Sequence, residues 1–328
     1  MPDSPIGMGA ASNKEGRVMS FRENMGKKLD LLKKNFVKHR YIYLMLIPVL
    51  AYYVIFKYIP MYGVQIAFKD FRPGLGIAGS TWVGLKHFED FFTSVYFLRV
   101  FRNTILISLF SIIFGFPLPI VLALMLNELR CMRYKRIVQT ISYMPHFIST
   151  VVVSGMIINF TASRGLINEI VELLGGERQT MLLNQDLFRP IYIISGLWQW
   201  TGWDSIIFLA ALSGIDPQLY DAATIDGAGR FRKMAHVTIP GISATIIVLF
   251  ILRIGNVMSV GYEKIILLYN PSIYETADVI SSFVYRKGLL EFNFSYSSAV
   301  GLFNSGINLV FLVGANTLSR KINNTSLW

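Results

Sequence analysis

The sequence predicts an all-α membrane protein with about six transmembrane helices, and three observations lead to this expectation. The 328 residues are 53% hydrophobic and only 16% charged, against about 25% charged residues in soluble domains. Long apolar stretches recur, each near the ~20 residues that a spanning helix needs. Basic residues gather in alternate connections, as is typical of multi-pass proteins. We expect the spans at 41–60, 104–126, 137–160, 188–212, 241–260 and 298–318.

The distribution of Lys and Arg predicts the orientation of the chain. If the N-terminus lies in the cytoplasm, most of the 31 Lys and Arg residues fall on inner segments. Both termini and the connection 213–240 are therefore expected on the cytoplasmic side. The chain then divides into a cytoplasmic basic leader (1–40), a transmembrane domain (41–318) and a cytoplasmic tail (319–328).

The leader has two interpretations. Leu29, Leu32 and Phe36 recur at helical spacing among many basic residues, which is typical of an amphipathic helix on an anionic leaflet. A solvated segment that only sets the orientation fits the same residues equally well.

The composition argues against several functions. The net charge of +11 would suggest nucleic acid in a soluble protein, but here the positive-inside bias accounts for it. Cys131 is the only cysteine, and the four His residues show no ligand spacing, so no metal site is expected. The chain has no phosphate-binding loop, nucleophile elbow or dinucleotide loop. We therefore expect no catalytic residue and no cofactor bound by this chain.

A transporter without a nucleotide site uses either an ion gradient or the ATPase of a partner. Carriers driven by gradients usually place several ionisable residues inside the membrane. The ionisable residues inside the expected spans are few: Asp204 in the fourth, Arg253 in the fifth and Lys57 near the end of the first. This short supply favours an ATPase partner.

The inner connection 213–240 predicts a short helix that docks on another protein. Asp216 suits an N-cap and Pro217 the first helical position. The helix should continue over 218–225 and end at Asp226-Gly227. Its Ala222 and Ala223 offer a small face of the kind that fits a cleft on a partner. A plain structured loop is the alternative.

The same stretch carries a recognisable pattern. Asp221-Ala222-Ala223, then Gly227, then Val237-Thr238-Ile239-Pro240 keep the spacing Glu-Ala-Ala, three residues, Gly, nine residues, Ile-x-Leu-Pro. It resembles the EAA loop of binding-protein-dependent ABC importer permeases. The departures (Asp for Glu, Val for Ile, Ile for Leu) are each close in chemistry, and the shorter Asp221 side chain bears on the detail of its contact.

Further stretches resemble the carbohydrate permeases of the LplB and alginate-importer type, and the resemblance extends across most of the chain beyond the first ~35 residues. They are Lys57–Gly63, Trp82–Phe88, Ser142–Ser149, Leu267–Pro271 and Ala299–Phe303.

The resemblance implies a maltose-permease-like architecture in the bacterial cytoplasmic (inner) membrane. It implies a second homologous permease, two copies of a cytoplasmic ABC ATPase that hold ATP and Mg, and an extracytoplasmic solute-binding protein. Asp221–Gly227 would be the coupling helix that docks in an ATPase groove. The residues expected to couple to the ATPase are Asp221, Ala222, Ala223, Asp226, Gly227, Phe231 and Pro240.

Candidates for the substrate pathway begin in the fourth expected span. Gln199 and Trp203 share one helical face, and Trp200 and Asp204 share another. Aromatic rings stack on sugars, while amides and carboxylates bond to hydroxyls, so a sugar-contacting surface is one interpretation. A tryptophan belt at the membrane interface is the other.

Further candidates lie in the last two spans. Arg253, with Asn256 one turn later, is costly in a membrane unless it is paired or hydrated. It either pairs with Asp204 or faces a cavity and attracts an anionic sugar. Asn304 and Asn308 stand four residues apart and suit either a cavity lining or bonds between helices.

We therefore expect a permease subunit of an ATP-driven importer of oligosaccharides or polysaccharides, with an acidic glycan such as alginate as first choice and a neutral or other uronide glycan as second. This chain would have no catalytic role, because its partners would hydrolyse ATP. A secondary carrier driven by a gradient and a membrane-anchored scaffold or sensor are the alternatives from other classes.

Overall fold

The computed structural model describes residues 38–323, 326 and 327, and nearly all of the elements in this part are helical. The chain divides into two units, residues 1–64 and 65–328. The predicted leader (1–40) lies almost entirely outside the described residues, so both interpretations of it remain predictions.

The described part of the first unit is one long apolar helix. It comprises α2 (Arg40–Tyr53), a π-helical turn (Val54–Tyr58) and α3 (Ile59–Met61). With the 3₁₀ turn Tyr62–Phe68 it makes a continuous stretch of 29 residues that is apolar enough to span a membrane. The helix is therefore longer than the predicted span 41–60. No side chain of α2 is buried within the chain, as expected where lipid or another subunit covers a helix.

The second unit begins with short elements. The strands β1 (Lys69–Asp70) and β2 (Thr81–Trp82) pair antiparallel, with Lys69 opposite Trp82. The 3₁₀ turn Pro73–Leu75 and α4 (Gly76–Gly79) connect them, and α5 (Lys86–Thr93) follows.

Two predicted spans differ from the helices that form. The second is longer than predicted, because α6 (Phe97–Gly115) continues into α7 (Pro117–Asn127) over 31 residues. The third, 137–160, is wrong as a single helix. It consists of α8 (Met132–Tyr143), a 3₁₀ turn (Met144–Phe147) and α9 (Thr150–Thr161), followed by α10 (Leu166–Leu173). Pro145 interrupts the helix because proline has no backbone N–H to donate.

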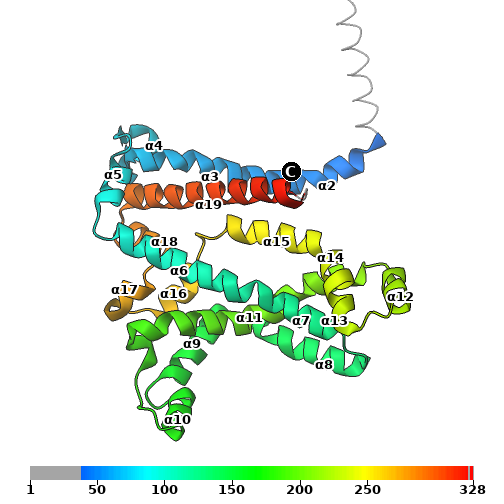
Figure 1. The fold of residues 1–328 in the computed structure, drawn as a ribbon. Coiled ribbons are helices and arrows are strands. Elements are labelled where there is room, and N and C mark those ends of the chain that lie inside the picture. The colour runs from blue at the N-terminus through cyan, green and yellow to red at the C-terminus, as the bar shows by residue number, and fades with distance from the viewer. Residues whose placement is uncertain (1–37, 324–325, 328) are drawn as a thin grey trace, which may run out of the picture. The chain divides into compact units, whose positions relative to one another are not determined.

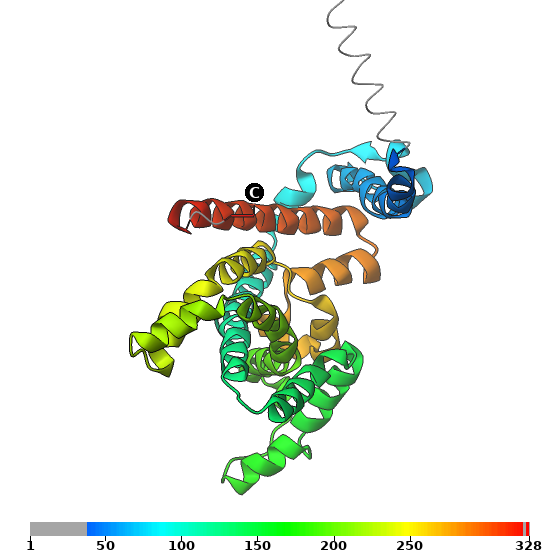
Figure 2. The same cartoon turned by 90° about the vertical axis from the view of Figure 1, so that its right-hand side faces the viewer.

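The long helix α11 (Gln185–Ser213), entered through the 3₁₀ turn Met181–Leu183, packs against α6, α7 and α8. In Figure 2 it lies among the other helices of the second unit. A Cβ atom at Gly202 would lie only 1.9 Å from the carbonyl oxygen of Ser142, so glycine is needed where α11 crosses α8.

The remaining spans lie near the C-terminus. A bent pair forms where the segment Arg230–Gly241 meets α15 (Ser243–Gly255) at 60°. The last helix, α19 (Phe294–Asn323), packs against α15. Within the described residues, four stretches are long and apolar enough to span a membrane, and the bent pair makes up to five. With 29 residues α11 is long enough to be a sixth, but its polar stretch around Gln199 and Asp204 lowers its apolarity.

Between α15 and α19 the chain forms a compact set of short elements. They are α16 (Tyr262–Leu268), a 3₁₀ turn (Pro271–Ile273), α17 (Tyr274–Ala277), α18 (Ile280–Tyr285) and a π-helical turn (Arg286–Leu290). Figure 1 shows these elements at the opposite end of the second unit from α12 (Pro217–Ile225).

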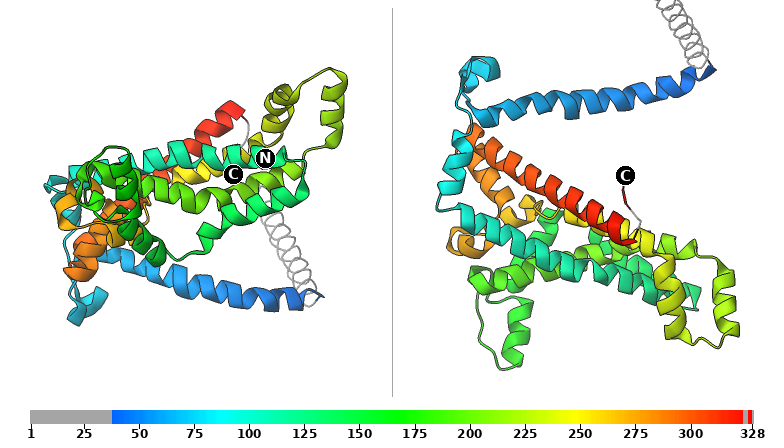
Figure 3. Two further views of the ribbon diagram at one scale, coloured as in Figure 1. Left: turned by 90° about the horizontal axis from the view of Figure 1, so that it is seen from below. Right: turned by 45° about the horizontal axis from the view of Figure 1, so that its top comes forward.

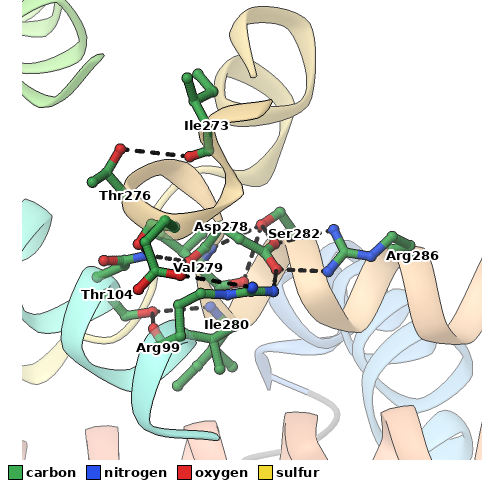
Figure 4. A network of polar contacts seen from close by, with 12 residues as sticks. Arg99, Thr104, Ile273, Thr276, Asp278, Val279, Ile280, Ser282 and Arg286 are labelled. Atoms are coloured by element: carbon green, nitrogen blue, oxygen red, sulfur yellow. Dashed lines mark hydrogen bonds and ion pairs between the residues drawn. The ribbon is translucent and has the colours of Figure 1, made fainter. Parts of the chain in front are cut away.

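A buried carboxylate, Asp278, holds this set together (Figure 4). Arg286 donates to Asp278 Oδ2 at 2.6 Å and Arg99 of α6 donates to the same atom at 3.4 Å. Ser282 donates to the other carboxylate oxygen at 2.8 Å. Burial lowers the pKa of Arg286, but the hydrogen bond and charge of Asp278 outweigh this and raise it above its ordinary value. Arg286 therefore stays charged, and the network ties α18 to α6.

Three apolar clusters form the core. One surrounds Phe91 and Phe283, a second joins Ile107 and Phe188 to α16, and the third joins Leu124, Phe208 and Ile242. The third cluster lies next to the connection that carries α12. The two ends of this connection therefore pack against buried apolar side chains.

Candidate functional site

The inner connection forms the predicted helix. α12 starts at Pro217, and the Asp216 side chain caps it by accepting from the backbone N–H of Gln218 at 2.9 Å. The helix ends at Ile225, and Gly227 follows in the left-handed conformation with φ of 72°. The N–H of Ala228 closes the turn by donating to the Ala223 carbonyl at 2.9 Å. The local rules read from the sequence therefore describe this element correctly.

Contacts within the chain fix the base of this connection. The hydroxyls of Tyr220 and Thr238 lie 3.1 Å apart, and Lys233 donates to Thr224 Oγ1 at 2.6 Å. Arg230 forms an ion pair with Glu128, which follows directly after α7. The connection continues through α13 (Arg230–Lys233), a π-helical turn (Met234–Thr238) and α14 (Ile239–Gly241). Movement of α12 would thus pull on α7 and on the bent pair.

The predicted coupling residues differ in exposure. Asp221, Ala222, Asp226, Gly227 and Pro240 are exposed, whereas Ala223 is half-buried, so only one of the two alanines faces fully outward.

Two large apolar side chains at the far end of this connection are widely exposed. Ile225 is 87% exposed and Phe231 is 82% exposed. Figure 3 shows α12 and α13 at the end of the second unit away from α17 in both views. Exposed large apolar side chains around a short helix, beyond the ends of the spans, are typical of a protein-docking surface.

A second feature is a cavity of about 540 Å³ within the second unit. It lies among α6, α9, α11, α15 and α16. Five of the eight predicted pathway residues line it: Gln199, Trp200, Asp204, Arg253 and Asn256. The face of α11 that bears Trp200 and Asp204 thus points inward to the cavity.

The other three predicted pathway residues lie outside this cavity. Trp203 stacks on the His146 ring, with centroids 4.2 Å apart. Asn308 accepts from the N–H of Met258 at 2.9 Å and donates to Ser259 Oγ at 2.9 Å, so it joins α19 to the residues after α15. Asn304 does not line the cavity, and its buried Oδ1 has no hydrogen-bond partner among the described residues.

Arg253 is the main cation of the cavity. Its charge acts on Asp204, but no ion pair within 4.0 Å forms between them among the described residues, so direct pairing is not what the structure shows. The guanidinium of Arg253 lies beside Gly115, where an added Cβ atom would be in ordinary van der Waals contact with Nη2 at 3.8 Å. Gln199, by contrast, is almost fully buried and donates to the Ile148 carbonyl at 3.3 Å.

The sequence interpretation missed Lys264 and Tyr192, which also line the cavity. Lys264 lies in a connection, so its position relative to the spans drew no attention. A signal was present, because Lys264 directly precedes the apolar run 265–268. A lysine at the edge of such a run often has a buried stem.

Comparison with known proteins now places the chain in a family. Residues 115–323 match the family described as "Binding-protein-dependent transport system inner membrane component", and the chain belongs to this family. It is therefore a multi-pass permease of the inner membrane, in the class of ABC importers for sugars and oligosaccharides. This membership does not support a secondary carrier driven by a gradient.

Two relatives come from Bacillus subtilis (strain 168). The chain is 44% identical to the "Polygalacturonan/rhamnogalacturonan transport system permease protein YteP", over 94% of this chain and 95% of that protein. It is 46% identical to "Protein LplB", over 89% of this chain and 92% of that protein. The relatives are transport permease subunits.

The fold is similar to two solved structures. One is a bacterial ABC transporter involved in the import of the acidic polysaccharide alginate, with a TM-score of 0.82 and 43% identity over 89% of this chain and 99% of that one. The other is a bacterial alginate ABC transporter in complex with an alginate pentasaccharide-bound periplasmic protein, with a TM-score of 0.82 and 42% identity over 90% and 99%. The predicted fold class and type of importer are thus confirmed.

Proposed function

We propose that this chain is the pathway-forming permease subunit of an ATP-driven importer of acidic oligosaccharides or polysaccharides, with alginate as first choice. The observation that carries the proposal is the cavity, in which Arg253 forms no ion pair with any described residue. Asp204 and Glu263 line the same cavity, but neither forms a direct ion pair with Arg253 among the described residues. A cation without a direct partner is costly in a membrane, and an anionic substrate would offset that cost as it passes. The alginate importer and the polygalacturonan permease among its relatives support the same choice.

The rest of the lining suits a sugar. Trp200 presents a half-exposed ring, and Asn256, Ser108 and Ser111 bring amide and hydroxyl groups to the same cavity. A ring that stacks on a pyranose, with polar groups that bond its hydroxyls, is a common way to bind carbohydrate. A neutral or other uronide oligosaccharide is the second candidate. The Trp200 ring and the polar groups beside it would bind such a glycan as well as they would bind alginate.

The energy would come from partners. We propose that the chain pairs with a second homologous permease, that α12 docks in a groove of one of two cytoplasmic ABC ATPase subunits, and that an extracytoplasmic solute-binding protein delivers the glycan. ATP and Mg would be held by the ATPase subunits alone. The open Ile225 and Phe231 side chains support the docking step, and both termini would lie in the cytoplasm.

The mechanism follows from linkage between binding and conformation. Closure of the ATPase dimer on ATP would move α12, and the ties from Arg230 to Glu128 and from Tyr220 to Thr238 would carry that movement to α7 and the bent pair. ATP drives the change only if it binds one state better than the other. The loaded solute-binding protein must favour one state too, so it should raise the rate of ATP hydrolysis by the partners.

The test is transport by the reconstituted complex with Arg253→Gln. We expect uptake of an acidic glycan to fall at least about tenfold, since a hydrogen bond to a charged group contributes about 1.5–3 kcal/mol, while uptake of a neutral glycan of the same length changes little. Arg320→Gln, a basic residue in the last turn of α19, is the matched control. Equal losses for both glycans would remove the anion-binding role of Arg253.

A further inference from the structure

Lys264 is a buried cation that pairs with no carboxylate within 4.0 Å in the part of the chain that the structure describes. The residue lies in the first turn of α16 and is only 8% exposed. Its Nζ atom donates to the Tyr192 carbonyl at 3.4 Å and lies 5.1 Å from the centre of the Tyr192 ring. Within the described residues it forms no ion pair with a carboxylate. Both of its contacts are with electrically neutral groups.

Two other cations near this region, Arg99 and Arg286, do have a counter-ion within the chain. Arg99 and Arg286 share the buried carboxylate of Asp278. Lys264 has no such arrangement, although burial of a charge normally calls for a counter-ion. Burial accordingly lowers the pKa of Lys264 to about 8. A charge that the fold itself does not neutralise is available to a ligand.

The surroundings of Lys264 leave room for that ligand. Its side chain lines the same cavity as Arg253. A Cβ atom at Gly196 would lie 3.9 Å from Lys264 Nζ, just as one at Gly115 would lie 3.8 Å from Arg253 Nη2. Each cation thus faces a residue without a side chain, in one continuous space. Lys264 follows α15 in the chain, on the segment that runs toward α17 and α18 (Figure 1).

We propose that Lys264 is a specificity-determining residue that binds a carboxylate of the passing glycan, as a second anion contact beside Arg253. This inference rests on the proposed function. Two cations in one cavity would hold a chain that bears a carboxylate on successive sugar units better than one with a single charge. A neutral glycan would gain nothing from either of them, so the pair selects for acidic chains.

The preference should depend on pH with a defined sign. The titratable groups around Lys264 are Tyr192 and Asp204 of α11, Arg253 of α15, and its neighbours Tyr262 and Glu263, while Tyr285 of α18 stacks on Tyr262. The α9 helix, which packs against α16, has no titratable side chain. Lys264 is charged below about pH 8 and neutral above it. The preference for acidic glycans should therefore fall as the pH rises from 7 to 9.

The experiment uses the whole importer, co-purified with its partners and reconstituted in nanodiscs. An oligogalacturonate of fixed length and its fully methyl-esterified, neutral form are the two probes. The concentration that half-saturates ATPase stimulation is measured for each, with the same solute-binding protein throughout. For Lys264→Met we expect this concentration to rise at least about tenfold for the acidic probe and less than about twofold for the neutral one.

Two further measurements separate a binding role from a structural one. Lys264→Arg keeps the charge at every pH, so it should retain the preference and lose the fall between pH 7 and 9. The pH profile of the unaltered importer needs no variant and applies even if Lys264→Met does not fold. Equal losses on both probes, or an unaltered importer whose preference is flat across pH 8, would overturn the role of Lys264.

The outcome also separates this inference from the proposed function. An unaltered importer that no glycan stimulates, or that responds equally to both probes, overturns the proposed acidic-glycan function and the role of Lys264 together. An importer that prefers the acidic probe, with the preference intact in Lys264→Met, overturns only the role of Lys264.

Discussion

The two ends of the second unit differ in what they bury: one exposes large apolar side chains, and the other buries a paired carboxylate. At one end, α12 and α13 leave Ile225 and Phe231 more than four-fifths exposed. At the other, Asp278 is fully buried and its two arginines satisfy it within the chain. The open apolar side chains of the first end are what we expect of a surface that docks on a partner, whereas the charges of the Asp278 network at the second end are paired within the chain. The difference predicts how substitutions at each end should behave.

The largest effect is expected at Gly227, where φ of 72° strains any residue with a Cβ atom. Gly227→Val should distort the end of α12 and reduce ATPase stimulation in the reconstituted complex to background. Gly229→Ala is the matched control, since its φ is −71° and nothing lies near an added Cβ atom. Full stimulation by Gly227→Val would show that the shape of this turn does not matter for coupling.

Asp278→Asn should act on stability rather than on docking. It leaves Arg286 without a counter-ion and Arg99 with only the exposed Glu275 at 4.0 Å, and breaking a buried pair in this way costs about 3–5 kcal/mol. We expect the melting temperature of the purified chain to fall by at least about 5 °C. Asp70→Asn, in an exposed pair with Arg72, should shift it by less than about 1 °C. Similar shifts for the two variants would contradict the contrast between the ends.

Phe231→Ala should do the reverse, with little change in stability and a clear loss of partner binding. Burial of such a side chain in an interface contributes about 1.5–3 kcal/mol, so the ATPase should bind roughly tenfold more weakly or worse in a co-purification titration. Leu173→Ala, at a side chain that is 86% exposed in α10, serves as the control. Unchanged affinity for Phe231→Ala would remove this side chain from the docking surface.

The smallest effect is expected for the ion pair between Arg230 and Glu128, because both side chains are partly exposed to solvent and such pairs contribute about 0.2–1 kcal/mol. Glu128→Gln should lower glycan-stimulated ATP hydrolysis by less than about fivefold without loss of ATPase binding. The exchange Glu128→Arg with Arg230→Glu should restore it. A loss that the exchange does not repair would mean that Glu128 acts through another contact.

The contrast between the ends also explains which features were predictable. The α12 connection follows local rules, since a cap, a proline, a small face and a glycine stand within a dozen residues. The Asp278 network joins residues 99, 278 and 286, and the cavity joins α6, α11, α15 and α16, so neither has a local pattern. Spacing on α11 places Trp200 and Asp204 on one face, and this face lines the cavity. It could not show that Trp203 stacks on His146, a residue of another segment.

The span predictions failed for a similar reason. Hydropathy detects apolar length, and it does not detect a break such as the one at Pro145 within an apolar stretch. The helix α11 is less apolar than the recognised spans, and several of its polar side chains line the cavity. Low apolarity in a span here coincides with side chains that line a cavity.

The central claim is that a partner ATPase drives this chain through α12, and site-directed cross-linking tests it most directly. In a Cys131→Ser background, which removes the only native cysteine of this chain, Ile225→Cys would be labelled with a maleimide that carries a benzophenone. Irradiation of the intact complex then inserts the benzophenone into a C–H bond of the protein that lies against it. We expect a cross-link to the ATPase subunit, and none from Leu173→Cys at the opposite end. Absence of a cross-link from Ile225→Cys in a complex that hydrolyses ATP, or a cross-link from Leu173→Cys, would contradict the claim.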